Sequence, residues 1–148
     1  MIDSPYFYMF PVGNELMKYD KLAINVVVVT KDGGIDNCGI LFTDDLEQFH
    51  LAYLRLTKQV TETCETYQCG EEYAIIGTSA LVDYEIDGAV TLYSGIYNNP
   101  FLIWGSYRKR LLKTTISFSF QFHHTQMDGA TAAKFLTCLQ EEMKQLSF

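Results

Sequence analysis

Two adjacent histidines, followed by an aspartate and a glycine, give this sequence its clearest capacity for chemistry. Residues 123–129 read HHTQMDG. A neutral imidazole accepts a proton near neutral pH, so histidine is the usual general base in enzymes. Asp128 follows His124 by four residues, where its carboxylate could cap the next helix or hold a cation. Gly129 allows backbone geometry that other residues avoid.

A regular strand and a long helix flank this segment. Over residues 114–123, apolar side chains alternate with small polar ones, which is typical of a strand with one buried face. From Gly129 to Leu146 an apolar stripe at helical spacing predicts a helix. The stripe comprises Ala132, Leu136, Leu139, Met143 and Leu146. A loop between two such elements keeps a side chain both fixed and accessible.

The rest of the chain predicts more strands than helices. Residues Asp44–Thr61 predict a helix capped by Asp44, with Glu47 at its third position. Its apolar stripe comprises Leu46, Phe49, Tyr53, Leu56 and Val60. We expect strands at Leu22–Thr30, Gly39–Phe42, Tyr73–Leu81, Ala89–Tyr93 and Phe101–Trp104, a helical turn at Glu15–Tyr19, and a hairpin turn at Asp32–Gly34. The stretch Tyr6–Val12 is aromatic and apolar, with Pro5 and Pro11 as breaks. This order predicts an α+β domain with a mixed sheet.

Length and composition limit the possible functions. The 148 residues predict one domain, spanning 1–148. A net charge of -7 argues against binding to nucleic-acid phosphates or anionic lipids. No apolar run is long enough to span a bilayer and the first residues do not resemble a signal peptide, so we expect a soluble, cytoplasmic protein. The four cysteines form no Cys-x-x-Cys pair, which favours free thiols.

The HHxxxDG motif, with its flanking strand and helix, resembles the chloramphenicol acetyltransferases. It resembles dihydrolipoyl acyltransferase cores and peptide-synthetase condensation domains more loosely. Asp45–Phe49 is similar to the central helix of the first family, and Thr78–Leu81 to its Ser-Ala-Leu strand. Pro100–Tyr107 is similar to the segment before its active-site strand. The resemblance covers Tyr6 to Leu146 and is most specific in the last third.

The resemblance implies a coenzyme-A-dependent O-acetyltransferase fold and reaction. Acetyl-CoA would be the co-substrate and a small hydroxylated molecule the acceptor, with chloramphenicol, and so antibiotic resistance, as one candidate. His124 would be the general base, and Asp128 with Gly129 the structural anchor of the active-site loop. The family is trimeric, with each site in a cleft between subunits. Such chemistry needs neither a metal nor a covalent enzyme intermediate.

Several positions depart from the family pattern. The chain begins where the family's first helix ends, so it apparently lacks the N-terminal segment and the arginine that pairs with the motif aspartate. Gly88 aligns with a serine that stabilises the oxyanion, so Thr91 or Tyr84 would have to replace that donor. Residues 82–84 replace a usual aromatic pair, which predicts a different acceptor pocket.

Three features leave alternatives open. The basic run 108–113 is interpreted as a solvated turn, with contact of Arg108 and Lys109 to coenzyme A phosphates as the alternative. A zinc site of His123, His124 and Asp128 is disfavoured, because adjacent strand residues point to opposite sides. For the whole chain, the alternatives are a non-catalytic member of the fold that binds another partner, and an enzyme with a different acyl donor or acceptor.

Overall fold

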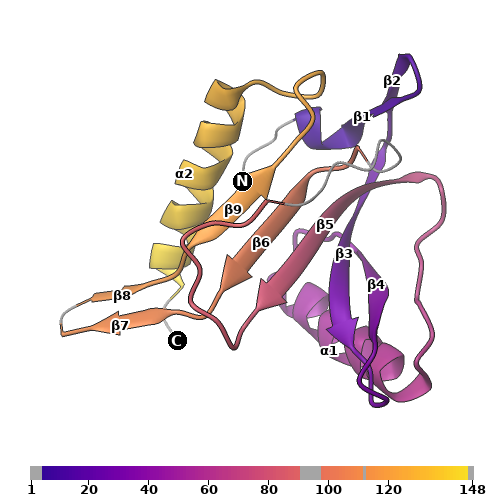
Figure 1. Ribbon diagram of the computed structural model, residues 1–148. Coiled ribbons are helices and arrows are strands. Elements are labelled where there is room, and N and C mark those ends of the chain that lie inside the picture. Colours follow the sequence, from indigo (N-terminus) through magenta and orange to yellow (C-terminus); the bar gives the residue numbers. More distant parts are fainter. Residues whose placement is uncertain (1–4, 91–97, 112, 147–148) are drawn as a thin grey trace.

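The computed structural model describes residues 5–90, 98–111 and 113–146, and its centre is a mixed five-stranded sheet (Figure 1). The strand order is β4-β3-β5-β6-β9. The strands are β3 (Lys21–Val29), β4 (Ile35–Leu41), β5 (Tyr73–Leu81), β6 (Phe101–Gly105) and β9 (Phe118–Gln121). Strands β3, β5 and β6 are parallel, whereas β4 and β9 run antiparallel at the two edges. This architecture confirms the predicted α+β class.

Two helices, α1 (Leu46–Thr63) and α2 (Gly129–Gln145), cover the same face of this sheet. The register places Cys38, Val26, Thr78, Leu102 and Phe120 in one cross-strand row, so their side chains share a face. The first core cluster, under α1, comprises Val28, Cys38, Ile40, Leu56 and Val60. The second, under α2, comprises Phe7, Met127 and Ala132, with Phe120, Phe122 and Phe135 packed against it. Within the described residues, neither helix is long and apolar enough to cross a membrane.

The opposite face of the sheet is partly covered by the loop after β5. A Cβ at Gly105 would lie 2.5 Å from the Tyr84 carbonyl oxygen, so the loop backbone rests directly on the end of β6. The Ala89 N–H donates to the Ser119 hydroxyl at 2.8 Å, which ties the same loop to β9. The predicted strand at Ala89–Tyr93 is not formed at residues 89 and 90, and its remainder lies outside the described residues.

The N-terminal residues form a short hairpin, and the helical turn predicted at Glu15–Tyr19 is wrong. Residues Pro5–Tyr8 form a 3-10 turn (η1), so only β1 (Met9–Val12) is extended there. Residues Glu15–Lys18 form the strand β2 rather than a helical turn. The reversal occurs at Gly13, whose φ of 60° is open to glycine at low cost, and it folds β2 back against β1.

The strand predicted for residues 114–123 is divided between two sheets. β8 (Lys113–Thr115) pairs with β7 (Arg108–Arg110) in a separate hairpin, and β9 joins the central sheet. The basic run is therefore a β-hairpin and not simply a solvated turn. The alternation of apolar residues continues through the break, and for this reason the sequence pattern could not reveal it.

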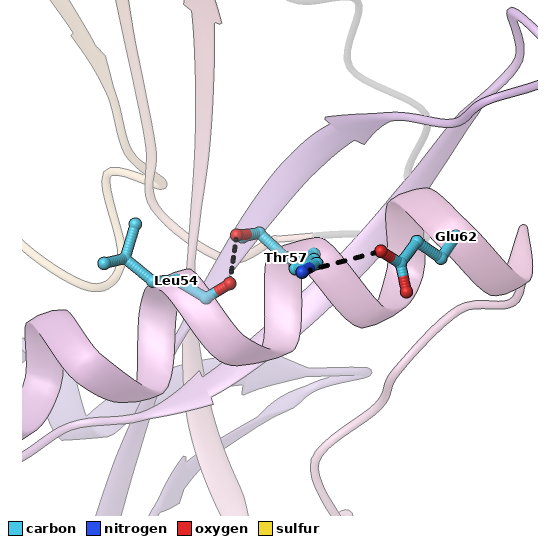
Figure 2. A network of polar contacts seen from close by, with 4 residues as sticks. Leu54, Thr57 and Glu62 are labelled. Carbon is cyan, nitrogen blue, oxygen red and sulfur yellow. Dashed lines mark hydrogen bonds and ion pairs between the residues drawn. The ribbon is translucent and has the colours of Figure 1, made fainter.

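Helix α1 is shifted slightly from its predicted start. Asp45, not Asp44, is the N-cap, and its carboxylate accepts the Gln48 N–H at 3.0 Å. On the exposed side of α1, the Thr57 hydroxyl donates a hydrogen bond to the Leu54 carbonyl oxygen (3.5 Å), and Lys58 forms an ion pair with Glu62 (3.8 Å) (Figure 2). Of the predicted stripe, Leu46 and Tyr53 are exposed, and Ala52 packs against the core instead.

Candidate functional site

His124 lies in the turn between β9 and α2 with its side chain exposed to solvent. The N–H groups of Gln126 and Met127 both donate to the His123 carbonyl, at 2.9 and 3.3 Å, and close the turn. The Thr125 N–H donates to Nδ1 of His123 at 3.2 Å. His123 is therefore part of the hydrogen bonding of the turn, whereas the imidazole of His124 is presented to the outside.

Two buried side chains that the sequence did not single out fix this turn. Gln126 is 2% exposed, and its Nε2 donates to the Tyr6 carbonyl at 2.9 Å. Met127 is 3% exposed and packs with Phe7 and Ala132. Gln126 and Met127 therefore anchor the turn, while His124 before them and Asp128 after them are exposed. The apolar Met127 between polar neighbours was the one signal of this arrangement in the sequence.

Loss of the Gln126 anchor should destabilise the protein measurably. Gln126→Ala removes the donor to Tyr6, but Gln126 Oε1 is buried with no partner among the described residues, and its removal relieves that cost. We therefore expect a net loss near the middle of the usual range, about 1 kcal/mol. Urea unfolding followed by circular dichroism measures it. Gln140→Ala, at an exposed position of α2, should change stability by less than about 0.5 kcal/mol. Equal effects of both substitutions would contradict the anchor role.

Asp128 caps helix α2 and interacts electrostatically with His124. Its carboxylate accepts the Thr131 N–H at 2.7 Å. This hydrogen bond lowers the pKa of Asp128, with a smaller contribution from the charge of His124. No arginine among the described residues pairs with Asp128. Gly129, expected to need unusual backbone geometry, has no positive φ, and a Cβ there would meet nothing within 4 Å. Of the anchor role expected for Gly129, the structure shows only its position as the first residue of α2.

The lowered pKa of Asp128 makes a prediction about acid unfolding. A group whose folded pKa is depressed contributes stability above its unfolded pKa, here 3.8, and loses it as the pH falls through the folded value. Asp128→Asn keeps a cap acceptor but does not titrate, so its melting temperature should fall less steeply than that of the wild type below about pH 4. Thermal unfolding between pH 7 and pH 3 tests this. Asp44→Asn, at an exposed position, should follow the wild type. Parallel curves for all three proteins would contradict the prediction.

Tyr84, one of the predicted oxyanion donors, does not approach His124 within one chain. The Ser106 N–H donates to the Tyr84 carbonyl at 2.8 Å, so Tyr84 lies beyond the C-terminal end of β6. Phe101, at the other end of β6, pairs with Gln121, and His124 follows from there. At about 3.3 Å per residue, the length of β6 alone separates the two sites by about 13 Å. Tyr84 therefore cannot donate to a group bound at His124 of the same chain.

The basic residues Arg108 and Lys109 also lie away from this imidazole. Arg108 forms ion pairs with Glu85 (3.0 Å) and Asp87 (2.8 Å), which raise its pKa. Lys109 follows on the same hairpin, over the ring of Tyr107 at 5.4 Å. Thr91 lies outside the described residues, and Gly88 is exposed in the loop that Ser119 binds. Of the predicted site residues that the structure describes, one chain thus brings only His124, Asp128 and the adjacent Gly129 together.

Comparison with known proteins supports a specific fold. No protein-family model matches the sequence, and no curated protein matches it. Among solved structures, a chloramphenicol acetyltransferase aligns with a TM-score of 0.73 and 17% identity, over 88% of this chain and 66% of that chain. A probable dihydrolipoamide acetyltransferase from Listeria monocytogenes aligns with a TM-score of 0.72 and 14% identity, over 97% and 64%. The dihydrolipoamide acetyltransferase of Azotobacter vinelandii aligns with a TM-score of 0.66 and 19% identity, over 93% and 60%.

The likeness is therefore one of fold, and the chain spans 60–66% of the length of these three structures. The fold consists of a mixed five-stranded sheet with two helices on one face. It includes the strand–turn–helix segment around His124. The chain has the coenzyme-A-dependent acyltransferase fold, which it shares with chloramphenicol acetyltransferase and with dihydrolipoamide acetyltransferase cores.

Proposed function

We propose that this protein transfers an acetyl group from acetyl-CoA to a hydroxyl of a small molecule, with His124 as the general base. One observation carries the proposal: an exposed imidazole stands between the last sheet strand and a capped helix, on a fold that known acetyltransferases share. In the Azotobacter enzyme a serine, a histidine and an asparagine four residues after that histidine were investigated for roles in catalysis. Asp128 follows His124 at the same interval.

The chemistry needs few protein groups. His124 removes the proton of the acceptor hydroxyl, and the oxygen attacks the thioester carbonyl. The tetrahedral intermediate collapses, the carbon–sulfur bond breaks, and the thiolate of coenzyme A takes up the proton. Asp128 fixes the loop through the helix cap. Since the thioester is already activated, deprotonation of the acceptor and charge on the tetrahedral oxygen are the main barriers.

A second copy of the chain would complete this site, because Tyr84, the predicted oxyanion donor that the structure describes, lies away from His124 in one chain. We assign that donor to Ser79 of a neighbouring copy. Ser79 is half-buried on the face opposite the helices, and its hydroxyl makes no hydrogen bond within the described residues. In the Azotobacter enzyme the serine precedes the histidine by about fifty residues, and Ser79 precedes His124 by a similar interval. Ser79 thus replaces Thr91 and Tyr84 as the preferred donor, and a trimer is the proposed assembly.

Thiol release tests the reaction directly. The purified protein is mixed with acetyl-CoA and a panel of hydroxylated acceptors, with chloramphenicol first, and free coenzyme A is followed with a thiol reagent. We expect release that depends on one acceptor, and acetylation of that acceptor by mass spectrometry. If no acceptor raises release above that with acetyl-CoA alone, the protein is a non-catalytic member of the fold.

A further inference from the structure

The loop after β5, residues 82–90, lies on the sheet face opposite the two helices and is here called the strap. It runs from the end of β5 past the tip of β6 toward β9 (Figure 1). Ile86 and Ala89 are half-buried, whereas the other strap residues are exposed. A Cβ at Gly105 of β6 would lie 2.8 Å from Cγ1 of Ile86, so this side chain packs directly on the strand. The strap therefore turns two side chains toward the sheet and the others toward solvent.

Backbone hydrogen bonds hold the strap at two points. The Ser106 N–H donates to the Tyr84 carbonyl at 2.8 Å, and the Ala89 N–H donates to the Ser119 hydroxyl at 2.8 Å. Between these points, residues 85–88 make no backbone hydrogen bond within the described part of the chain. Side chains must therefore hold the middle of the strap in place.

One arginine, at the start of the β7–β8 hairpin, supplies the ionic contacts of this middle part. Nε of Arg108 lies 3.0 Å from Oε2 of Glu85, and Nη1 of Arg108 lies 2.8 Å from Oδ1 of Asp87. The strap also contains Asp83 and has no lysine or arginine of its own, so its carboxylates repel one another. Among the described residues, no other cation forms an ion pair with them. Arg108 therefore offsets a charge that favours an open strap.

The strap borders the row of side chains that contains Ser79. Ser79 pairs in register with Ile103, and Ile103 pairs with Ser119, so all three side chains point away from the helices. Ser119 is the residue that binds the end of the strap. Two strand spacings, about 10 Å, separate Ser119 from Ser79, which leaves the width of a small molecule between them. The closed strap can therefore form one wall of a site beside Ser79.

We propose that Arg108 is a positioning residue, which holds the strap closed and so shapes the acceptor side of the proposed site of His124 and Ser79. The effect on the acceptor rests on the proposed function, whereas the closure of the strap does not. Without this guanidinium, the strap carboxylates repel one another and turn toward solvent, and the strap opens more often. Arg108 thus acts through the strap and not by binding the phosphates of coenzyme A.

Hydrogen exchange measures closure of the strap without any need for activity. We expect Arg108→Gln to raise the exchange rate of the Ala89 amide by about two- to fivefold, the effect of losing a partly exposed ion-pair network. High salt should raise this rate in the wild type, because it screens the ion pairs, and should affect the variant less. Arg55→Gln removes the same charge from an exposed arginine of α1 that forms no ion pair among the described residues, and should leave the strap unchanged. Amides of β3 report in the same experiment that the sheet is intact.

Steady-state kinetics separate positioning of the strap from binding of coenzyme A. Arg108→Gln should raise KM for the acceptor several-fold, with kcat within about twofold of the wild type and KM for acetyl-CoA unchanged, because the base and the proposed oxyanion donor remain. Glu85→Gln with Asp87→Asn removes the partners of Arg108 and should raise the acceptor KM in the same direction. Adding Arg108→Gln to that pair should raise it no further, since all three residues act as one network.

Three results would overturn the proposal. The first is a strap that exchanges at the same rate in Arg108→Gln and in the wild type. The second is an unchanged acceptor KM in a variant whose strap exchanges faster. The third is a rise in KM for acetyl-CoA, which would assign Arg108 to coenzyme A instead. A protein without acceptor-dependent release would reject the proposed function, and the exchange rates would still decide whether Arg108 holds the strap.

Discussion

His124→Ala is expected to lower acceptor-dependent release of coenzyme A by about 10²–10⁴-fold, the usual contribution of a positioned general base. The imidazole is exposed, so its removal should not disturb the core. The turn is held instead by Gln126 and Met127, which remain. The loss should therefore appear in kcat, with the circular dichroism spectrum and the melting temperature close to those of the wild type.

His50→Ala is the matched control for this substitution. His50 is an exposed histidine on α1, the helix that covers the other core cluster. Its replacement should leave the rate unchanged. His123→Ala is less informative, because Nδ1 of His123 takes part in the turn and its loss alters the backbone around His124. If His124→Ala and the wild type release thiol at the same acceptor-dependent rate, His124 is not the base.

Ser79→Ala is the second substitution with a large expected effect. Loss of one oxyanion donor lowers kcat by about 10²–10³-fold with little change in KM, since the bond forms fully only in the transition state. Ser106→Ala, a half-buried serine just beyond β6, is the control and should retain activity. A change in KM alone would assign Ser79 to substrate binding instead.

The same two variants test whether the site is shared between copies. His124 lies in the turn after β9, whereas Ser79 lies on β5 toward the other end of the sheet, so one chain cannot place both on one carbonyl. Co-refolded His124→Ala and Ser79→Ala chains would contain sites with both wild-type groups, and activity should recover well above that of either variant. Absence of recovery from a mixed assembly would show that the two residues do not act across an interface.

The fold prediction succeeded where the physical signal is local. Strand β5 was predicted with its observed limits, and the helix after the histidine turn to within a residue of its end. Period-two alternation and the cap at Asp128 act over a few residues, so they can be read without knowledge of the neighbours. The first helix shows the limit of this reasoning. Asp44 and Asp45 are both suitable caps, and only the observed Gln48 N–H distinguishes them.

The failures occur where the structure of a segment depends on which strand it pairs with. β2 forms because β1 is beside it, and the strand before His124 divides because its halves find different partners. The stripe on α1 was imperfect for a related reason. The position of β3 and β4 determines which side of the helix is buried, and periodicity alone left Leu46 and Tyr53 indistinguishable from core residues.

By itself the sequence determined a histidine turn, the strand and helix around it, and a resemblance to acyltransferases, because these depend on neighbouring residues. Only the tertiary structure decided that Tyr84 and the β7–β8 hairpin lie at the far end of β6 from His124, and that Gln126 and Met127 are buried and anchor the histidine turn. Distances between strands follow from register and direction. These are set by contacts between residues remote in sequence, whose energies no local pattern contains.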